Sequence, residues 1–293
     1  MATLAFFKSL IPVTLHWKTA PLSSVYYPPI AIVCYLTLIF SLRRFMRDRP
    51  PVKLRSLTVL HNVFLCALSL AMGVGVLSEV VKVFAANATP SNPFAGTNAV
   101  LCDPTGASMT GRMGWWMYVF YVSKYYELLD TVIMVLKKRP LNFLHVYHHC
   151  IVLPLFYVYM STSMVLQWIV VVANSSVHVA MYYYYAMAAL GHKVWWKKYI
   201  TLAQIVQFII DLTSTWPYPF LYFSASGCSG SMRGWLFGQA VGASFFKLFC
   251  DFYFRSYTKS KNLKAQQKAH PSEEVNDLKK ETEPKDVDHK KIE

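Results

Sequence analysis

Seven long apolar segments constrain the fold of this chain more than any other feature of its sequence. The hydrocarbon core of a bilayer is about 30 Å thick, so a helix that spans it needs about 20 mainly apolar residues. The candidate spans are residues 26–43, 57–81, 113–136, 142–163, 165–189, 199–222 and 233–255. In lipid, segments of this length satisfy their backbone polar groups only as helices. We therefore predict an all-α polytopic membrane protein with about seven transmembrane helices.

The composition agrees with the membrane class and argues against nucleic-acid binding. Hydrophobic residues make up 55% of the chain and charged residues only 15%, whereas soluble domains carry about 25% charged residues. The net charge is +14, which by itself would suit a nucleic-acid ligand. The basic residues, however, occur in short clusters between apolar segments, which is the pattern of membrane loops. We therefore expect no nucleic-acid partner.

The basic clusters also predict the orientation of the chain. Loops rich in Lys and Arg face the cytosol. The rich loops lie after the first, third and fifth spans, and their basic residues are Arg43, Arg44, Arg47, Arg49, Lys53, Arg55, Lys137, Lys138, Arg139, Lys193, Lys197 and Lys198. This arrangement predicts a lumenal N-terminus and a cytosolic C-terminus.

The spans make residues 1–258 one membrane domain, and residues 259–293 have a different composition. The latter are rich in Lys, Glu, Asp and Gln with few large apolar residues, which predicts a disordered tail. Lys290 and Lys291 stand near the end of that tail and resemble the dilysine signal for retrieval to the endoplasmic reticulum. A chance pair in a lysine-rich tail is the alternative.

Cys102 and Cys228 are the only cysteines outside the expected spans, and both fall in loops predicted to be lumenal. An oxidising lumen makes them candidates for a disulfide. Two free thiols remain the alternative, because sequence alone does not show pairing.

Four polar strings interrupt the apolar segments. They are 124-KYYELLDT-131, 145-HVYHH-149, 174-NSSVHVAMYYYY-185 and 201-TLAQIVQ-207. Ionisable side chains at membrane depth are costly and usually mark a pathway or a reaction site. Helical spacing places His145, His148 and His149 on one face. A rise of 1.5 Å per residue places His148 and Gln204 both about 9 Å from the cytosolic end of their spans. The strings therefore predict one buried chamber that opens to the cytosol.

Several of these residues also have a purely structural interpretation. Lys124 and Glu127 can form a buried ion pair, and Gln204 and Gln207 can join helices by hydrogen bonds. His61 and His192 are isolated in the sequence and receive no role.

Histidine strings in membrane enzymes indicate two kinds of chemistry. A di-iron centre, as in membrane desaturases and hydroxylases, needs more histidines than this chain places at membrane depth. The other chemistry uses imidazole as a nucleophile that accepts an acyl group from a thioester. We expect the second, with no metal, and keep a di-iron enzyme as an alternative. A seven-helix receptor or transporter is the non-enzymatic alternative.

The four strings, in this order, resemble the signature strings of the ELO fatty acid elongases, and the resemblance covers nearly the whole chain. It implies a 3-oxoacyl-CoA synthase of the endoplasmic reticulum that condenses a long-chain acyl-CoA with malonyl-CoA. The product would be two carbons longer, with CO2 and CoA released and no bound cofactor. Six of the seven helices would enclose a tunnel for the acyl chain.

The resemblance also implies roles for individual residues. His148 would carry the acyl group as an acyl-imidazole, His178 would assist in proton transfer or in positioning malonyl-CoA, and His145 and His149 would shape and polarise the site. The residues expected to bind substrate are Lys124, Glu127, Asp130, Asn174, Tyr182, Gln204 and Gln207, with Lys137, Lys138 and Arg139 suited to the phosphates of CoA.

The implied partners are acyl-CoA, malonyl-CoA, membrane lipid and the other enzymes of the elongation cycle, namely a ketoacyl reductase, a dehydratase and an enoyl reductase. A homo-oligomer is left open. Val146 within the histidine string favours polyunsaturated chains, whereas Pro140 stands where members acting on such chains often carry Gln.

Overall fold

The computed structural model describes residues 14–92, 94–224 and 227–259, and most of them are helical. The helices are η1 (Trp17–Thr19), α2 (Tyr27–Phe45), α3 (Arg55–Asn87), α4 (Phe94–Leu101), α5 (Ala107–Thr110), α6 (Arg112–Tyr126), α7 (Leu129–Leu136), α8 (Phe143–Ser161), α9 (Gln167–Leu190), α10 (Lys197–Ser214), α11 (Tyr218–Tyr222), α12 (Met232–Tyr253) and the π-helical η2 (Phe254–Lys259). The expected tail beyond Lys259, including Lys290 and Lys291, lies outside the described residues.

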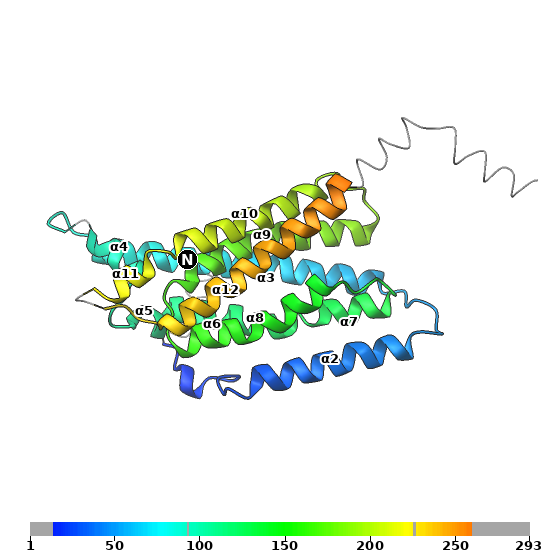
Figure 1. Cartoon of the computed structure of the whole chain (residues 1–293), viewed down its shortest axis with the longest axis horizontal. Coiled ribbons are helices and arrows are strands. Elements are labelled where there is room, and N and C mark those ends of the chain that lie inside the picture. The colour runs from blue at the N-terminus through cyan, green and yellow to red at the C-terminus, as the bar shows by residue number, and fades with distance from the viewer. Residues whose placement is uncertain (1–13, 93, 225–226, 260–293) are drawn as a thin grey trace, which may run out of the picture. The chain divides into compact units, whose positions relative to one another are not determined.

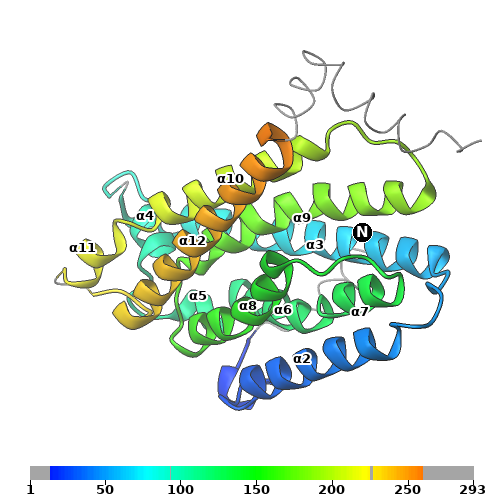
Figure 2. The same cartoon turned by 45° about the vertical axis from the view of Figure 1, so that its right-hand side comes forward.

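The chain divides into two compact units, Met1–Phe249 and Cys250–Glu293. In the first unit, α3 packs against α9, α4 and α6, and α10 packs against the other side of α9 (Figures 1 and 2). α2 packs against α7 and α8, and α8 also contacts α6. In the second unit the structure describes only the end of α12 and η2.

Every expected span contains a long helix or a pair of helices. Three helices, Tyr27–Phe45, Arg55–Asn87 and Phe143–Ser161, are long and apolar enough to cross a membrane by length and composition alone. The prediction of an all-α polytopic membrane protein is confirmed. Of the other long helices, α9 carries the polar string 174–185 and α10 carries the string 201–207.

The third expected span, residues 113–136, is not one continuous helix. α6 ends at Tyr126 and α7 begins at Leu129. Across this break Leu128, Asp130 and Thr131 bond to carbonyls three residues earlier, where an α-helix would bond four residues back. Such tight turns inside a helix are found at functional positions.

The sixth expected span, residues 199–222, is also divided. α10 ends at Ser214, and the short α11 follows at Tyr218–Tyr222. The cause lies in two prolines, because Pro217 before α11 and Pro219 in its first turn lack the backbone N–H that would continue the α10 ladder.

Small residues let the long helices approach closely around α3. At Gly75 a Cβ atom would overlap the indole ring of Trp116 on α6, and at Gly73 it would lie 3.2 Å from Cβ of Ser175 on α9. Small residues at helix interfaces are typical of membrane bundles, where close backbone packing provides much of the association energy.

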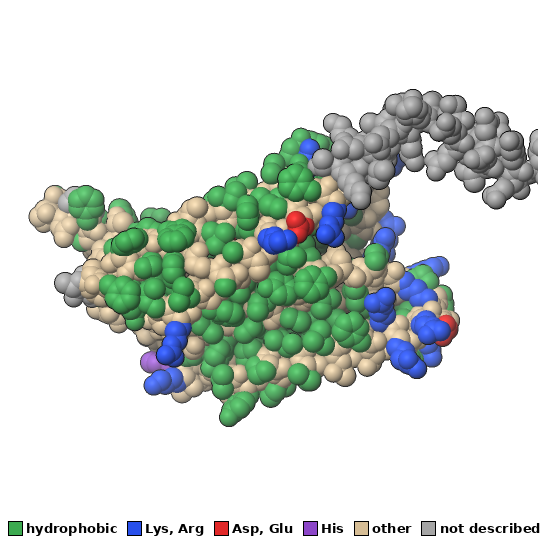
Figure 3. All heavy atoms as spheres, viewed as in Figure 1, with side chains coloured by type: hydrophobic (Ala, Val, Ile, Leu, Met, Phe, Trp, Pro, Cys, Tyr) green, Lys and Arg blue, Asp and Glu red, His purple; other side chains and the backbone are tan. Residues whose placement is uncertain are grey.

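Apolar side chains cover much of the outside of the first unit. Exposed large residues such as Leu38, Leu60 and Val206 face outward from α2, α3 and α10. Figure 3 shows Lys and Arg side chains gathered where α2 ends and α3 begins. Such a large exposed apolar surface is expected of a protein that lies in lipid.

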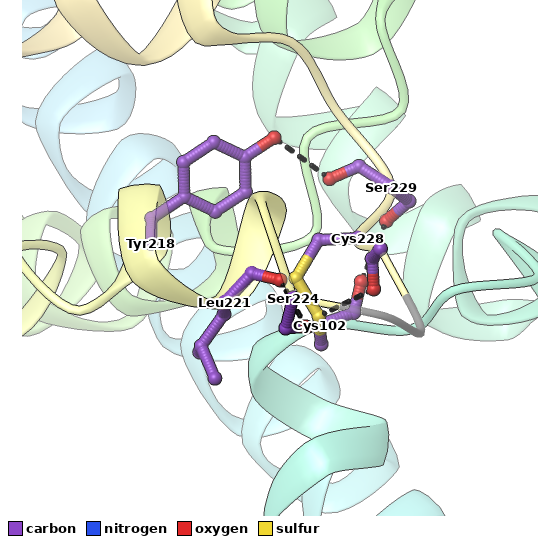
Figure 4. Close-up of a disulfide and its surroundings, with 7 residues drawn as sticks. Cys102, Tyr218, Leu221, Ser224, Cys228 and Ser229 are labelled. Carbon is purple, nitrogen blue, oxygen red and sulfur yellow. Dashed lines mark hydrogen bonds between the residues drawn. A yellow bond between two sulfur atoms is a disulfide. The ribbon is translucent and has the colours of Figure 1, made fainter.

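At the opposite end, a disulfide joins Cys102 to Cys228, which are 126 residues apart in the sequence. Figure 4 shows the bond beside a turn that is held by further hydrogen bonds. Ser229 donates its backbone N–H to the carbonyl of Cys102 at 2.9 Å, and the hydroxyl of Tyr218 donates to the carbonyl of Ser229 at 3.0 Å. The disulfide therefore links the loop after α4 to the loop before α12.

Removing this disulfide should destabilise the protein strongly. A cross-link that closes a loop of this length restricts the unfolded chain, which corresponds to about 4–5 kcal/mol in the chain-entropy description. Cys228→Ser is expected to lower the thermal unfolding temperature in detergent. Cys34→Ser, at an exposed free cysteine on α2, is the control and should leave the temperature unchanged. Equal unfolding temperatures for both variants would contradict the prediction.

Candidate active site

Three polar side chains at the break between α6 and α7 bond in different directions. Glu127 accepts hydrogen bonds from Ser123 Oγ at 3.1 Å and from Lys124 Nζ at 2.8 Å, both within its own segment. Asp130 reaches α3 and α9, and Thr131 reaches α2 and α8. This short segment therefore joins most of the helices that surround the histidines.

Lys124 is buried, and its charge is matched on several sides. Besides Glu127, Nζ donates to Oδ1 of Asn174 on α9 at 3.3 Å and lies 3.9 Å from the centre of the Phe120 ring. A buried ammonium group is tolerable only with such partners. The ion pair that the sequence left as a structural alternative is present, and Lys124 also reaches the α9 string.

The three histidines of the string 145-HVYHH-149 lie on one face of α8, as helical spacing predicts. Asn142 caps the helix by accepting the backbone N–H of His145 at 2.7 Å. The His149 ring lies 4.5 Å from that of His145 and 5.5 Å from that of His148, measured between ring centres. Nδ1 of His148 and Nδ1 of His149 are buried and have no hydrogen-bond partner among the described residues.

His145 and His148 face different surroundings. Nε2 of His145 is 2.8 Å from Oγ1 of Thr131, which is 2.9 Å from the hydroxyl of Tyr35. His145 is thus anchored by hydrogen bonds. His148 instead contacts the ring of Phe245 on α12, with ring centres 5.1 Å apart.

His148 also lines a narrow cavity of about 60 Å³ between α6, α8, α9, α10 and α12. Its polar side chains are Lys124, His148, Asn174, Gln207, Asp211, Thr215 and Gln239, and its apolar lining includes Val152, Leu155, Phe156, Val170, Leu212, Val241 and Phe245. Lys124, His148 and Asn174 come from three of the four signature strings, and Gln207 comes from the fourth. The polar groups are spread along the cavity, because Gln207, Asp211 and Thr215 follow one another at one-turn spacing on α10 and its C-terminal end.

Four of the predicted site residues therefore meet at the cavity, and the others lie around it. Asp130 and Tyr182 bond to each other, with the Tyr182 hydroxyl 2.9 Å from Oδ2 of Asp130. The ring of His178 packs against that of Tyr182, with centres 5.5 Å apart. Gln204 lies outside the cavity lining and places Nε2 3.9 Å from Sδ of Met181.

The basic residues expected to bind CoA lie at the end of α7. Lys137 Nζ donates to Oγ1 of Thr58 at 3.3 Å, and Lys138 Nζ donates to the carbonyl of Arg47 at 3.0 Å. The side chain of Arg139 is exposed. These three basic residues therefore lie beside the basic loop between α2 and α3.

Sequence reasoning missed His61, and it also missed Thr215 and Gln239 in the cavity lining. Nε2 of His61 is 2.6 Å from Oδ1 of Asp130, and the His61 side chain is 5% exposed. A signal was present in the sequence, because His61 and Asn62 are adjacent polar residues inside a long apolar helix, where each needs a buried partner. The sequence did not show which residue that partner is.

Within the part of the chain that the structure describes, no three His, Cys, Asp or Glu side chains are placed to hold a metal ion. The di-iron alternative thus finds no ligand set in those residues.

A family model and several known proteins that are similar to this chain all point to fatty acid elongases. The model of the GNS1/SUR4 (ELO) family matches residues 20–265. The chain is 35% identical to fatty acid elongase sre1 of Dictyostelium discoideum, over 88% of this chain and 93% of the relative. It is 36% identical to fatty acid elongase A of the same organism, over 85% and 90% respectively. With very long chain fatty acid elongase 5 of Xenopus tropicalis the identity is 31%, over 80% and 76%.

Proposed function

The chain belongs to the ELO (GNS1/SUR4) family of fatty acid elongases, and on that premise we propose that it is a 3-oxoacyl-CoA synthase. It condenses a long-chain acyl-CoA with malonyl-CoA to give a 3-oxoacyl-CoA two carbons longer. The observation that carries the proposal is the place of His148, in a cavity where it meets the polar groups of Lys124, Asn174 and Gln207 and where α8 beyond it contributes apolar side chains. An acyl thioester has the same division, with a polar reacting group and an apolar chain.

In the first step a ring nitrogen of His148 attacks the thioester carbonyl carbon. The C–N bond forms, the C–S bond breaks, and CoA leaves as its thiol after taking up a proton. The resulting acyl-imidazole divides one difficult condensation into two easier reactions. Its acyl chain extends along Val152, Leu155 and Phe156, which follow His148 on the same helix and line the cavity. Because about 60 Å³ holds only a few water molecules, the surrounding helices must separate to admit the chain.

In the second step malonyl-CoA loses CO2, and the carbanion that forms attacks the acyl carbonyl carbon. The new C–C bond forms as the C–N bond to His148 breaks, and the departing imidazolate takes up one proton, which returns His148 to its neutral starting state. Negative charge develops on carbonyl oxygens in both steps and requires donors held in advance. Since Oδ1 of Asn174 accepts from Lys124, the amide NH2 group of Asn174 is left to donate into the cavity. His178 assists in proton transfer or in positioning malonyl-CoA.

The charge distribution supports a cytosolic entrance for CoA. The basic residues Lys137, Lys138 and Arg139 lie beside the basic loop between α2 and α3, since Lys138 donates to the carbonyl of Arg47 in that loop. Such groups suit the CoA phosphates. The proposed location is the endoplasmic reticulum membrane, with the N-terminus lumenal. The Cys102–Cys228 disulfide at the opposite end supports an oxidising lumen on that side.

The proposed substrate range and partners follow from the same assignment. We extend the proposal to long, polyunsaturated acyl chains on the basis of Val146, with no bound cofactor. The product then passes to a ketoacyl reductase, a dehydratase and an enoyl reductase, because a 3-oxo group needs those three steps to become saturated.

The purified protein in detergent should elongate one class of acyl-CoA. We would incubate it with a panel of acyl-CoAs that differ in length and unsaturation, together with labelled malonyl-CoA, and identify products by mass spectrometry. A 3-oxoacyl-CoA two carbons longer than a panel member is the expected result and also identifies the substrate class. Folded protein that forms no product from any member of the panel would overturn the proposal.

A further inference from the structure

We propose that His61 is a positioning residue for the condensation step. It acts through Asp130 and Tyr182 on His178, and the inference rests on the function proposed above. None of His61, Asp130 or Tyr182 belongs to the described lining of the cavity beside His148. Their contacts form a continuous chain behind that cavity, from α3 through the α6–α7 break to α9.

The first link is the carboxylate of Asp130, which uses each oxygen for a different helix. Oδ1 lies 2.6 Å from Nε2 of His61 on α3, and Oδ2 accepts the Tyr182 hydroxyl of α9 at 2.9 Å. Asp130 thus bridges two helices that are far apart in the sequence. Losing either donor would leave one carboxylate oxygen unsatisfied in a largely buried place, which is costly.

His61 is itself held on its other side. Its ring stacks on that of Tyr126, with centres 5.4 Å apart, and Nδ1 lies 3.4 Å from the Tyr126 hydroxyl. A neutral imidazole satisfies both contacts when Nε2–H donates to Asp130 and Nδ1 accepts from Tyr126. α3 also packs along α9, so the backbone that carries His61 has little freedom to shift.

The second link is the contact between Tyr182 and His178. These residues are one turn apart on α9, and their rings meet edge to face at 5.5 Å. Both side chains are buried. A hydrogen bond that fixes the Tyr182 hydroxyl therefore restricts the ring that packs against His178, and so the orientation of the imidazole.

This arrangement predicts different effects on the two half-reactions. Acylation of His148 by acyl-CoA depends on the cavity residues, whereas discharge by malonyl-CoA depends on His178. His61→Leu should slow discharge by about 10- to 100-fold, as removal of the hydrogen-bond partner that orients a metal-bound histidine does, and leave acylation essentially unchanged. A residue of purely structural importance would slow both steps together.

The two half-reactions can be measured separately on the full-length protein in detergent. Acylation is followed by intact-mass spectrometry after adding acyl-CoA alone, and discharge by adding malonyl-CoA to the acylated protein. His61→Gln retains an amide donor near the position of Nε2 and should restore most of the discharge rate. Asn62→Leu is the matched control, because Asn62 is equally buried on α3 and its one side-chain hydrogen bond among the described residues goes to the carbonyl of Thr58 in its own helix. It should leave the ratio of the two rates unchanged.

Equal slowing of acylation and discharge in His61→Leu would overturn the inference. If that variant does not fold, Tyr182→Phe provides the test. It removes a single hydroxyl from the same chain of contacts and should slow discharge alone. An unchanged ratio in Tyr182→Phe would equally overturn the inference. Failure of the proposed function is distinguishable, because wild-type protein would then form no acylated species at all.

Discussion

Replacing His148 by alanine is expected to abolish both half-reactions while the protein still folds. The variant lacks the nitrogen that accepts the acyl group, and no neighbouring side chain replaces it, since His145 is bonded to Thr131 and His149 is absent from the described cavity lining. The expected loss of condensation is at least about 10³-fold. Intact-mass spectrometry with acyl-CoA should show no adduct. The measurement is the rate of 3-oxoacyl-CoA formation.

His192→Ala provides the control for this prediction. His192 is an exposed histidine in the loop after α9, so its removal should leave both the adduct and the turnover unchanged. Normal turnover by folded His148→Ala protein would rule out the nucleophilic role of His148.

Breaking the buried Lys124–Glu127 pair is expected to destabilise the protein about as strongly as removing the Cys102–Cys228 disulfide. The two groups are 2.8 Å apart, and each side chain is only 2% exposed. Lys124→Met leaves an uncompensated buried carboxylate, and Glu127→Gln leaves an uncompensated ammonium group. Each should lower the free energy of unfolding by about 3–5 kcal/mol. The double variant should recover part of that loss, because neither charge remains unpaired.

The chain contains a matched pair for comparison. Glu79 and Lys82 have the same sequence spacing and are 2.6 Å apart, but their side chains are 15% and 61% exposed. Solvent screens that pair, so Lys82→Met should cost only about 0–1 kcal/mol. Denaturant unfolding in mixed micelles measures all four variants. Comparable losses for Lys124→Met and Lys82→Met would contradict the argument that burial sets the cost.

Helix positions were well predicted from the sequence, and helix interruptions were not. The segment 142–163 was expected as one helix and is observed at Phe143–Ser161, because an apolar run of that length satisfies its backbone only as a helix in lipid. The expected helix over 113–136 is broken after Tyr126. The polar string 124–131 stands at that break but does not show that the helix is interrupted there, since the partners of Asp130 and Thr131 lie on other helices.

The candidate site shows the same division. Faces shared by residues three and four apart, such as His145 with His149, follow from helical periodicity alone. The pairing of His61 with Asp130 joins residues 69 positions apart, and the contact of Tyr35 with Thr131 joins residues 96 apart. His61 therefore looked isolated in the sequence although it contacts the site.

The sequence by itself determined the membrane class, the approximate helices and the four polar strings, because lipid imposes length and internal hydrogen bonding on every span. It also determined which histidines share a face of α8. Only the tertiary structure decided which polar residues line the cavity with His148, that Cys102 pairs with Cys228, and that Asp130 bridges α3 and α9. The physical reason is that backbone periodicity is local, whereas the partner of a buried polar group is set by how distant helices pack.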